Sequence, residues 1–405
     1  MPHELFVTGL GVLSAIGQGK DAFADALFAG KSAFDWMQRP GRVGKGAYMG
    51  AELDDILFAR AIAKHKLRAT SLSSRAALAA VQEAWIEAAL SDLDPGRVGL
   101  VIGGSNLQQR ELVAMHEEYR DRPMFLRPTY ALSFMDSDIC GFCTEEFAIH
   151  GPSYTVGGAS ASGQLAIVQA AQAVETNQVD ACIALGALMD LSHWECQALR
   201  AVGAMGSDRY ANEPSLACRP FDRDHDGFIF GECCGAVVIE SAESSRRRDV
   251  NTYAALRGWG VAMDGNRNPN PSLDGEIRAI QHALDSAGWV SAQVDYVNPH
   301  GTGSVSGDET EVKALQACGL SRAYVNATKS LTGHGLSAAG AVEAIATLLQ
   351  MQAGRLHPTR NLENPIGADL NWVRNEPIDH QIDQALTLSM GFGGINTALC
   401  WERLN

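Results

Sequence analysis

The chain has 405 residues, 46% of them apolar, which is enough for a large buried core and enough length for two or three folding units. Its 32 Lys and Arg against 47 Asp and Glu give a formal charge of −15, which argues against a surface that wraps nucleic acid. No run of about 18 apolar residues occurs, and no basic segment with an apolar stretch opens the chain, so we expect a cytoplasmic protein without a membrane span.

Apolar runs alternate with Ala-rich helical stretches along the whole chain. This alternation predicts an α/β fold in which helices cover both faces of largely parallel sheets. The predicted strands of the first half are 5–9, 98–103, 154–156, 181–187 and 235–240. The predicted strands of the second half are 253–259, 294–298, 324–327 and 386–389, with helices at 308–317 and 338–351. Because both parts of the chain repeat this alternation of strands and helices, we predict two related halves.

The polar stretch 241–249 separates these halves. It contains three consecutive arginines, Arg246 to Arg248, and like charges in a row favour a solvated segment. We therefore predict two units, 1–245 and 246–405, joined by a solvated connection.

The nine cysteines do not indicate a metal site. The close sets are Cys140 with Cys143 and Cys233 with Cys234, and no second pair stands at zinc-like spacing. We expect reduced thiols and no bound metal.

Ser160 stands in a cluster of small residues, Gly157-Gly-Ala-Ser-Ala-Ser-Gly163, between a predicted strand and the helical run 164–175. This arrangement predicts a sharp turn at a helix N-terminus, where backbone N–H groups face a bound oxygen anion. Taken alone, the cluster is better explained by a close-packed turn with Ser160 as a helix cap. The histidine motifs further along the chain make a role for Ser160 in an active site the preferred interpretation.

Two histidines follow predicted strands in glycine-containing loops. His300 lies in Val297-Asn-Pro-His-Gly-Thr-Gly-Ser304, and His334 lies in Thr328-Lys-Ser-Leu-Thr-Gly-His334, just before an Ala-rich helix. Such loops carry catalytic groups in α/β proteins. Lys329 stands on the same loop as His334, which strengthens the case for a site. By contrast, His193 and His225 lie in polar turns and are predicted to be structural or solvated.

A further glycine loop, Gly391-Phe-Gly-Gly-Ile-Asn396, follows the last predicted strand. We expect the N–H of Phe392 to point toward the same place as the N–H of Ser160, which would make an oxyanion hole. Phe392 and Gly393 are accordingly predicted to line an acyl pocket.

These motifs resemble those of the β-ketoacyl-acyl-carrier-protein synthases of thiolase fold. The resemblance runs from Val7-Thr-Gly-Leu-Gly11 through Arg219-Pro-Phe-Asp-Arg-Asp-His-Asp-Gly227 to Gly391-Phe-Gly-Gly394, and it includes Ala338-Ala-Gly-Ala-Val-Glu343. It implies a thiolase-like fold of two similar halves in a layered α-β-α-β-α arrangement and a homodimer. It also implies a substrate on the phosphopantetheine arm of an acyl carrier protein, with no other cofactor.

One departure from the family pattern decides the expected chemistry. The condensing members have a nucleophilic cysteine in a Thr-Ala-Cys pattern, whereas this chain reads Gly158-Ala-Ser160. A serine hydroxyl is a far poorer nucleophile than a thiol of pKa about 8.5 at a helix N-terminus. Loss of CO₂ from a malonyl thioester needs no nucleophile, only donors that stabilise charge on the thioester oxygen.

The sequence therefore predicts a malonyl-acyl carrier protein decarboxylase that makes acetyl-acyl carrier protein without C–C condensation. Variants with serine at this position resemble the decarboxylases of polyketide β-branching cassettes, whose partners include a hydroxymethylglutaryl-CoA-synthase-like protein. His300 and His334 are predicted to donate as neutral imidazoles, and Ser160 to orient the malonyl group. Lys329 is predicted to support its loop, paired with Glu343. Smaller departures are Gly303, Ser304, Ser337 and Ile395.

Two alternatives stay open. In the first, Ser160 is a true nucleophile with His300 as its base, which would make an acyltransferase or thioesterase. In the second, the chain is a non-catalytic partner subunit like chain-length factors, although the presence of His300, Lys329 and His334 argues against this.

A docking surface for the carrier protein is predicted in the stretch 60–75. The basic side chains there are Arg60, Lys64, Lys66 and Arg68, on an otherwise acidic chain. A solvated helix face would explain them equally well.

Overall fold

The computed structural model describes residues 4–43, 48–58 and 70–404. The predicted docking residues Arg60, Lys64, Lys66 and Arg68 lie outside these described residues. No helix in the described ranges is long and apolar enough to cross a lipid bilayer. All nine cysteines are unpaired, and eight of them are buried.

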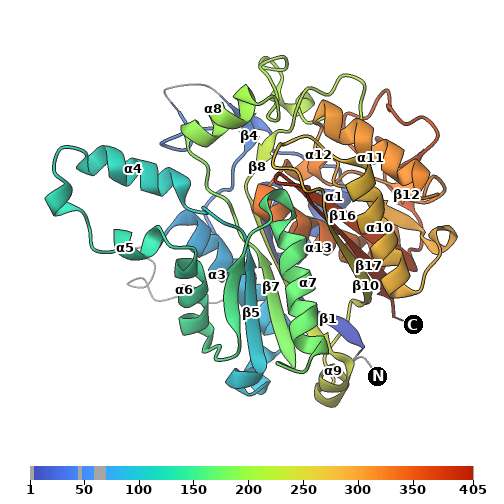
Figure 1. The fold of residues 1–405 in the computed structure, drawn as a ribbon, viewed down its shortest axis with the longest axis horizontal. Helices are drawn as coiled ribbons and strands as arrows, with labels where there is room; N and C mark the ends of the chain where they lie inside the picture. Colours follow the sequence, from blue (N-terminus) through green and yellow to red (C-terminus); the bar gives the residue numbers. More distant parts are fainter. Residues whose placement is uncertain (1–3, 44–47, 59–69, 405) are drawn as a thin grey trace.

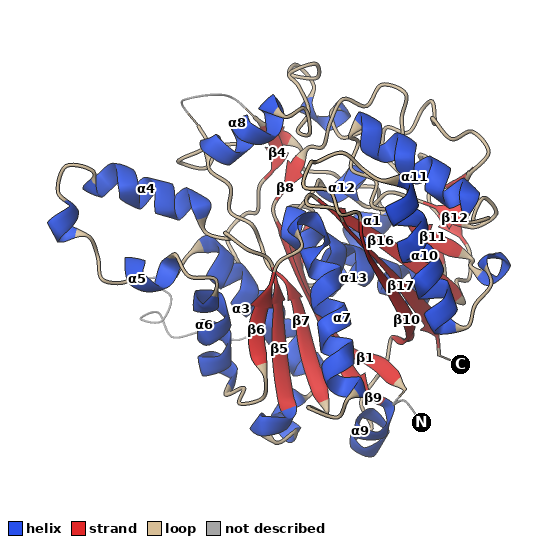
Figure 2. Cartoon of the chain, viewed as in Figure 1, coloured by secondary structure: helices blue, strands red, loops and turns tan. Residues whose placement is uncertain are grey.

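The described strands form a twelve-stranded mixed sheet and two smaller sheets. Figure 2 shows strands of the large sheet with helices packed on them. The order in its N-terminal half is β6 (Ser153–Val156), β5 (Val98–Gly103), β7 (Ala181–Gly186), β9 (Cys233–Ser241) and β1 (Leu5–Ser14), with β2 (Gly17–Gln18) paired to β1. The order in its C-terminal half is β14 (Asn371–Trp372), β12 (Tyr324–Val325), β11 (Tyr296–Asn298), β16 (Gln384–Gly391), β17 (Ile395–Arg403) and β10 (Ala254–Met263).

The two halves repeat one pairing pattern, so the predicted similarity is confirmed. In the first half β5 is parallel to β6 and β7, while β9 is antiparallel to β7 and β1. In the second half β11 is parallel to β12 and β16, while β17 is antiparallel to β16 and β10. The halves meet at β1 and β10, where Phe6 lies opposite Ala255.

The expectation of largely parallel sheets is wrong for the centre of the molecule, where β7, β9, β1, β10, β17 and β16 all pair antiparallel. Continuous apolar runs are typical of parallel strands because those strands are covered on both faces. Here the central antiparallel strands are covered on both faces too, and β1 and β9 are buried along their whole length. The apolar pattern therefore reported burial and carried no information on strand direction.

Helices on either side of the two half-sheets complete five layers, as predicted (Figure 1). The middle layer is α7 (Ser162–Glu175) and α13 (Ala339–Ala353), which contact each other and strands of both halves. One outer layer includes α3 (Leu72–Glu87) and α6 (Ser137–Phe147), and the other includes α10 (Leu273–Ala287) and α11 (Val305–Ala317). Residues 339–351 of α13 are all buried, as expected of a helix that is enclosed on every side.

Two glycines allow the middle helices to touch at their N-terminal ends. A Cβ on Gly163 would lie 2.7 Å from the backbone nitrogen of Ala341, and a Cβ on Gly340 would lie 3.0 Å from that of Gln164. Real Cβ atoms do not approach backbone this closely, so glycine is required for this contact. The close approach brings together the loops that precede α7 and α13.

The remaining described elements are short. The helices are α1 (Lys20–Phe28), α4 (Gln109–Tyr119), α5 (Tyr130–Ser133), α8 (His193–Ala201), α9 (Ala242–Arg248) and α12 (Lys329–Thr332). The smaller sheets are β3 (Asp35–Trp36) with β4 (Met49–Ala51) and β8 (Phe230–Gly231), and β13 (Arg355–Leu356) with β15 (Ile378–Asp379). The segment with α4 and α5 projects from the body as an arm at the left of Figure 1.

The predicted solvated connection at 241–249 is wrong in part, because it contains helix α9. Arg246 and Arg247 are exposed as expected, with side chains 67% and 60% accessible. The Arg248 side chain is 8% exposed and bonds to the Glu240 carboxylate and to the carbonyl oxygens of Ala88 and Ala89. A run of like charges does not reveal that one member has a buried partner. The proposed boundary after residue 245 falls within α9 and stays a prediction.

Each of the nine predicted strands overlaps an observed strand. The strand β17 lies beyond the last predicted strand, 386–389, and is not among the predicted strands. Gly393 and Gly394 have φ of +92° and +86°, and they form a tight turn that sends the chain back along β16.

Candidate active site

Ser160 lies in a short turn, Ala159–Ala161, between β6 and α7, which confirms the predicted sharp turn at a helix start. Ala159 has a φ of +47°, a conformation that non-glycine residues rarely adopt. The Ser162 hydroxyl stabilises the turn, because it accepts from the N–H of Gly158 at 2.9 Å and donates to the carbonyl of Ala159 at 2.7 Å. The half-buried Ser160 is thereby presented at the N-terminal end of a central helix.

His334 occupies the equivalent place in the second half, between β12 and α13. Its Nε2 lies 2.9 Å from the Ser160 hydroxyl, so the two central helices bring Ser160 and His334 into contact. The ring is buried and packs edge-on against Phe228, with centroids 5.1 Å apart. Among the described residues, Nδ1 of His334 has no hydrogen-bond partner. A buried N–H without an acceptor is costly, which favours the tautomer with the proton on Nε2.

His300 follows β11 and reaches the same point from the second half. Its ring lies edge-on to that of His334, with centroids 5.4 Å apart. The Lys329 ammonium, at the start of α12, donates to the carbonyl oxygen of His300 at 2.5 Å and lies 3.5 Å from its Nδ1. An ammonium only donates, so Nδ1 accepts and the ring proton lies on Nε2.

Burial and charge keep both rings neutral. Desolvation and the Lys329 ammonium lower the pKa of His300 and of His334 well below the ordinary value of 6.5, and His334 contributes to the effect on His300. The predicted Lys329–Glu343 pair is present, with 2.5 Å between Nζ and Oε1. Burial raises the pKa of Glu343 to about 7, against the opposing effect of Lys329. The site thus presents two neutral imidazole donors.

Two carboxylates that the sequence reading missed hold the His300 loop. Glu311 accepts from the N–H of His300 at 2.6 Å and of Gly301 at 2.8 Å. Asp308 accepts from the N–H of Gly303 at 3.0 Å and lies 3.1 Å from Nδ1 of His225. His225 is buried, which confirms its structural interpretation. Two acidic residues three positions apart on the helix directly after the loop were the available signal.

The glycine loop of Phe392 packs on the Ser160 turn. A Cβ on Gly391 would lie 2.2 Å from the carbonyl oxygen of Gly158, and the Ser389 hydroxyl donates to the carbonyl of Ser160 at 3.1 Å. Phe392 itself is 45% exposed. This packing supports the predicted oxyanion hole, whose two N–H groups remain a prediction.

A cavity of about 770 Å³ joins these groups, a size typical of small-molecule sites. Ser160, His300, His334 and Phe392 line it, whereas Gly393 and Glu343 do not appear among the described lining residues. The apolar lining residues include Met189, Leu191, Ala198, Leu199, Val202 and Phe228. The polar lining residues include Asp264, Glu276, Thr302, Ser304, Asp308 and Glu311.

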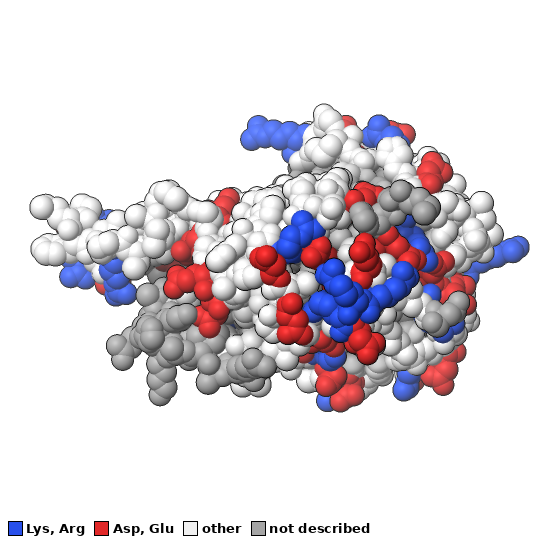
Figure 3. Space-filling model, turned by 90° about the horizontal axis from the view of Figure 1, so that it is seen from below, with Lys and Arg blue, Asp and Glu red and all other residues white. Residues whose placement is uncertain are grey.

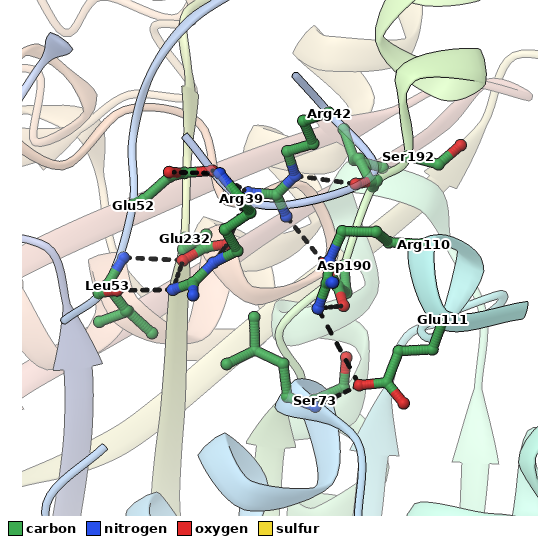
Figure 4. Close-up of polar contacts among 12 residues, drawn as sticks. Arg39, Arg42, Glu52, Leu53, Ser73, Arg110, Glu111, Asp190, Ser192 and Glu232 are labelled. Carbon is green, nitrogen blue, oxygen red and sulfur yellow. Dashed lines mark hydrogen bonds and ion pairs between the residues drawn. The ribbon is translucent and has the colours of Figure 1, made fainter. Parts of the chain in front are cut away.

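A network of ion pairs surrounds the buried Arg42 (Figure 4). Arg42 is fully buried, pairs with Asp190 at 2.8 Å and Glu232 at 2.6 Å, and donates to the carbonyl of Leu191 at 2.8 Å. Arg39 bonds to the same Glu232. Because Leu191 lines the cavity, the network holds the chain between β7 and α8 in place.

His193 is buried at the start of α8, where its Nδ1 lies 3.1 Å from the carbonyl oxygen of Gly41, which agrees with its structural interpretation. No group of three or more His, Cys, Asp or Glu in the described ranges is arranged to hold a metal ion.

The five-layer fold and the serine–histidine–histidine–lysine constellation define an enzyme of the thiolase-fold class. Residues 3–245 match the family "Beta-ketoacyl synthase, N-terminal domain", and residues 253–363 match "Beta-ketoacyl synthase, C-terminal domain". The chain belongs to the β-ketoacyl synthase family.

Similar proteins include curated sequences and solved structures. The polyketide biosynthesis malonyl-ACP decarboxylase PksF of Bacillus subtilis (strain 168) is 58% identical over 401 residues, which covers 99% of this chain and 97% of PksF. The 3-oxoacyl-(acyl-carrier-protein) synthase 2 of Coxiella burnetii is 31% identical and covers 99% of both chains. A β-ketoacyl synthase structure from Burkholderia phymatum STM815 is 26% identical over the full length of both chains, with a TM-score of 0.91. The ishigamide ketosynthase/chain length factor is 25% identical over the same extent, with a TM-score of 0.92.

Proposed function

We propose that this chain decarboxylates malonyl-acyl carrier protein to acetyl-acyl carrier protein in polyketide β-branching, without C–C condensation. The observation that carries the proposal is a serine, in place of a thiol, beside two neutral imidazoles in one cavity. The 58% identity to a protein named malonyl-ACP decarboxylase supports it. The substrate would arrive on a phosphopantetheine arm, and no other cofactor is proposed.

In the proposed mechanism His300 and His334 donate Nε2–H to the thioester carbonyl. As the carboxylate leaves as CO₂, negative charge moves onto that oxygen, and preorganised donors stabilise it more than they stabilise the ground state. Each neutral imidazole carries its proton on Nε2. In His300 this is because Nδ1 accepts from Lys329, and in His334 it is because the buried Nδ1 has no acceptor in the described structure. Lys329, paired with Glu343, acts by positioning the His300 loop.

Ser160 is proposed to orient the malonyl group through its hydroxyl and to remain unacylated. The alternative with Ser160 as nucleophile has one supporting contact, the 2.9 Å approach of His334, whereas its expected base was His300. A serine nucleophile also needs its base to be oriented by a third group. In the described structure His334 Nδ1 has no such partner. This argues against an acyltransferase or thioesterase.

The decisive experiment follows the mass of malonyl-carrier protein after incubation with the purified protein. We expect loss of CO₂ and accumulation of acetyl-carrier protein. Removal of one oxyanion donor typically costs a factor of about 10² to 10³ in rate, so His300→Ala should be slower by about that factor. Wild-type protein that is no faster than His300→Ala would refute the proposed function and favour the non-catalytic alternative.

The acyl carrier protein is the proposed partner, with docking through Arg60, Lys64, Lys66 and Arg68. One solved relative at 25% identity is a ketosynthase in complex with its acyl carrier protein. On the face seen from below, where α9 lies, basic side chains are interleaved with acidic ones (Figure 3). On this face Arg246 pairs with Glu4, and Arg247 pairs with Asp180. Because acidic partners neutralise these arginines, they are not proposed as a docking patch for the carrier protein.

A homodimer is proposed as the functional assembly. The arm with α4 and α5 carries exposed apolar side chains, including Met124 at 94% and Phe125 at 74% exposure. The strand β6 lies at the edge of the sheet beside α6. Exposed apolar groups and an open sheet edge on one side are typical of an interaction surface. A hydroxymethylglutaryl-CoA-synthase-like protein is proposed as a partner in the pathway.

A further inference from the structure

Glu276 is a buried carboxyl group in the cavity wall for which the proposed mechanism has no use. It lies one turn into α10, is 2% exposed, and lines the cavity that contains Ser160, His300 and His334. Among the described residues, its Oε2 has no hydrogen-bond partner. A buried polar group without a partner destabilises the fold, so its place beside the cavity calls for a functional reason.

Glu276 shares the cavity with both parts of the site. The start of α10 packs against the residue that follows the glycine loop, since a Cβ on Gly275 would lie 2.7 Å from Nδ2 of Asn396. The charge of Glu311, which accepts from the N–H groups of His300 and Gly301, acts on Glu276. Glu276 therefore lines the same cavity as the two imidazole donors and has the carboxyl group that holds the His300 loop among its neighbours.

The surroundings of Glu276 favour its neutral form. Burial, followed by the charges of Glu311, Asp264 and Asp308, raises its pKa well above the ordinary value of 4.5. Burial also raises the pKa of Glu311 to about 8. Both oxygens of Glu311 accept backbone N–H groups, which favours its charged form, whereas Oε2 of Glu276 has no such donor in the described structure.

The proposed reaction requires a proton at carbon. When the C–C bond breaks, its electron pair becomes the enolate, CO₂ leaves, and the α-carbon must gain one proton to become the acetyl methyl group. His300 and His334 are neutral, and a neutral imidazole is a very weak acid, as is the Ser160 hydroxyl. Lys329 is held by Glu343 and by the carbonyl of His300. A general acid must carry its proton at the operating pH, and burial favours the protonated form of a carboxyl group.

We propose that Glu276 is the general acid that protonates the enolate carbon after CO₂ departs. The inference rests on the proposed function. The Glu276 O–H bond breaks, the enolate electron pair forms the new C–H bond, and Glu276 becomes a carboxylate that regains a proton from water after the product leaves. One proton is consumed for each CO₂ released.

The test compares Glu276→Gln with wild type on malonyl-carrier protein. The amide has the same shape but no acidic proton, so we expect kcat to fall by about 100-fold or more, with KM within about twofold. Wild-type kcat should fall as pH rises through the pKa of Glu276, and this basic limb should be absent in the variant. The matched control is Asp274→Asn, the same chemical change on the exposed face of the same helix turn, which should keep wild-type kcat.

Two further measurements separate an acid from a structural group. A carboxyl whose pKa is raised on folding binds its proton more tightly in the native state, so the stability it contributes is lost as pH rises above 4.5. Glu276→Gln removes this loss and should therefore melt at or above the wild-type temperature at pH about 8. In a one-to-one mixture of H₂O and D₂O, the hydrogen-to-deuterium ratio of the acetyl methyl group should differ between wild type and the variant.

The outcomes distinguish the two proposals. If wild type makes acetyl-carrier protein while Glu276→Gln keeps kcat within about twofold and keeps the basic limb, the role of Glu276 is overturned and decarboxylation stands. If wild type releases no CO₂, both proposals fail. Should Glu276→Gln not fold, the wild-type profile decides, because a kcat that shows no decrease toward high pH rules out an acid of this kind.

Discussion

Ser160 and His334 are 2.9 Å apart, and that single contact is compatible with two chemistries. A serine nucleophile is activated when its base is itself held by a carboxylate or amide. In the described structure Nδ1 of His334 has no partner, so the contact is better explained as donation from Nε2 to the hydroxyl oxygen. In the presence of substrate the same N–H can turn to a thioester oxygen.

At this residue the proposal makes opposite predictions for two small changes. Ser160→Ala removes a group that only orients the malonyl unit, so decarboxylation should persist within about tenfold of wild type. Ser160→Cys places a thiol at the N-terminal end of α7, where the helix dipole lowers the pKa of a thiol, and should allow acylation. Intact-protein mass spectrometry after incubation with acyl-carrier protein measures both outcomes. An acyl adduct on wild-type Ser160, absent from Ser160→Ala, would restore the serine-nucleophile alternative.

At the scale of elements, the site depends on the contact between α7 and α13. Ser160 and His334 precede these two helices at equivalent positions of the two halves, and Gly163 and Gly340 allow the helix ends to touch. The equivalence follows from the repeated sheet order. A repeated α/β unit thus places one polar group of the site from each half at the same point.

Gly163→Ala tests this dependence. Its Cβ would lie 2.7 Å from the Ala341 nitrogen and 3.0 Å from the Ser337 carbonyl oxygen, neither of which can move without shifting α13. Overpacking typically costs about 1–3 kcal/mol, and we expect a loss of that order in urea unfolding together with slower decarboxylation. Gly141→Ala is the matched control, because Gly141 lies in α6 with no neighbour within 4 Å and should be stabilised by about 0.5–1 kcal/mol. Equal stability of the two variants would show that α7 and α13 tolerate separation.

At the scale of the whole molecule, the arm with α4 and α5 exposes apolar side chains to solvent in the single chain. Its exposed apolar side chains include Met124, Phe125, Leu132 and Phe134. Burial of apolar area contributes about 25 cal/mol per Å², so covering this arm would be a substantial driving force for association.

We therefore predict a dimer in solution, with a mass of about twice 43.2 kDa by light scattering. A double change, Met124→Ser with Phe125→Ser, should shift the equilibrium toward monomer at low concentration. Val290→Ser is a suitable control, since Val290 is 63% exposed on the described surface outside the arm. A wild-type protein that is monomeric at all concentrations would contradict the proposed assembly.

The local pattern of the sequence determined which segments form strands and helices and which loops carry polar groups. Each predicted strand exists, and Ser160, His300, Lys329 and His334 meet as expected, because loops at equivalent strand ends of an α/β fold converge. The family motifs added the layered fold and the serine in place of cysteine. Burial and turn formation depend mainly on neighbouring residues, so the sequence pattern predicts them segment by segment.

Only the tertiary structure decided strand direction and the partners of the buried charges. Parallel and antiparallel strands that are covered on both faces have the same apolar runs. The antiparallel centre of the sheet could therefore not be predicted from the sequence. Two contacts illustrate this point: the ion pair between Arg248 and Glu240, and the hydrogen bonds from the His300 loop to Glu311. Each contact depends on a backbone conformation that the sequence pattern does not predict. Glu276 had a local signal, since it stands on the buried stripe of α10 with Ile280, Ala283 and Leu284. Its neutral state and its place in the cavity come from the carboxylates and loops that the fold brings around it.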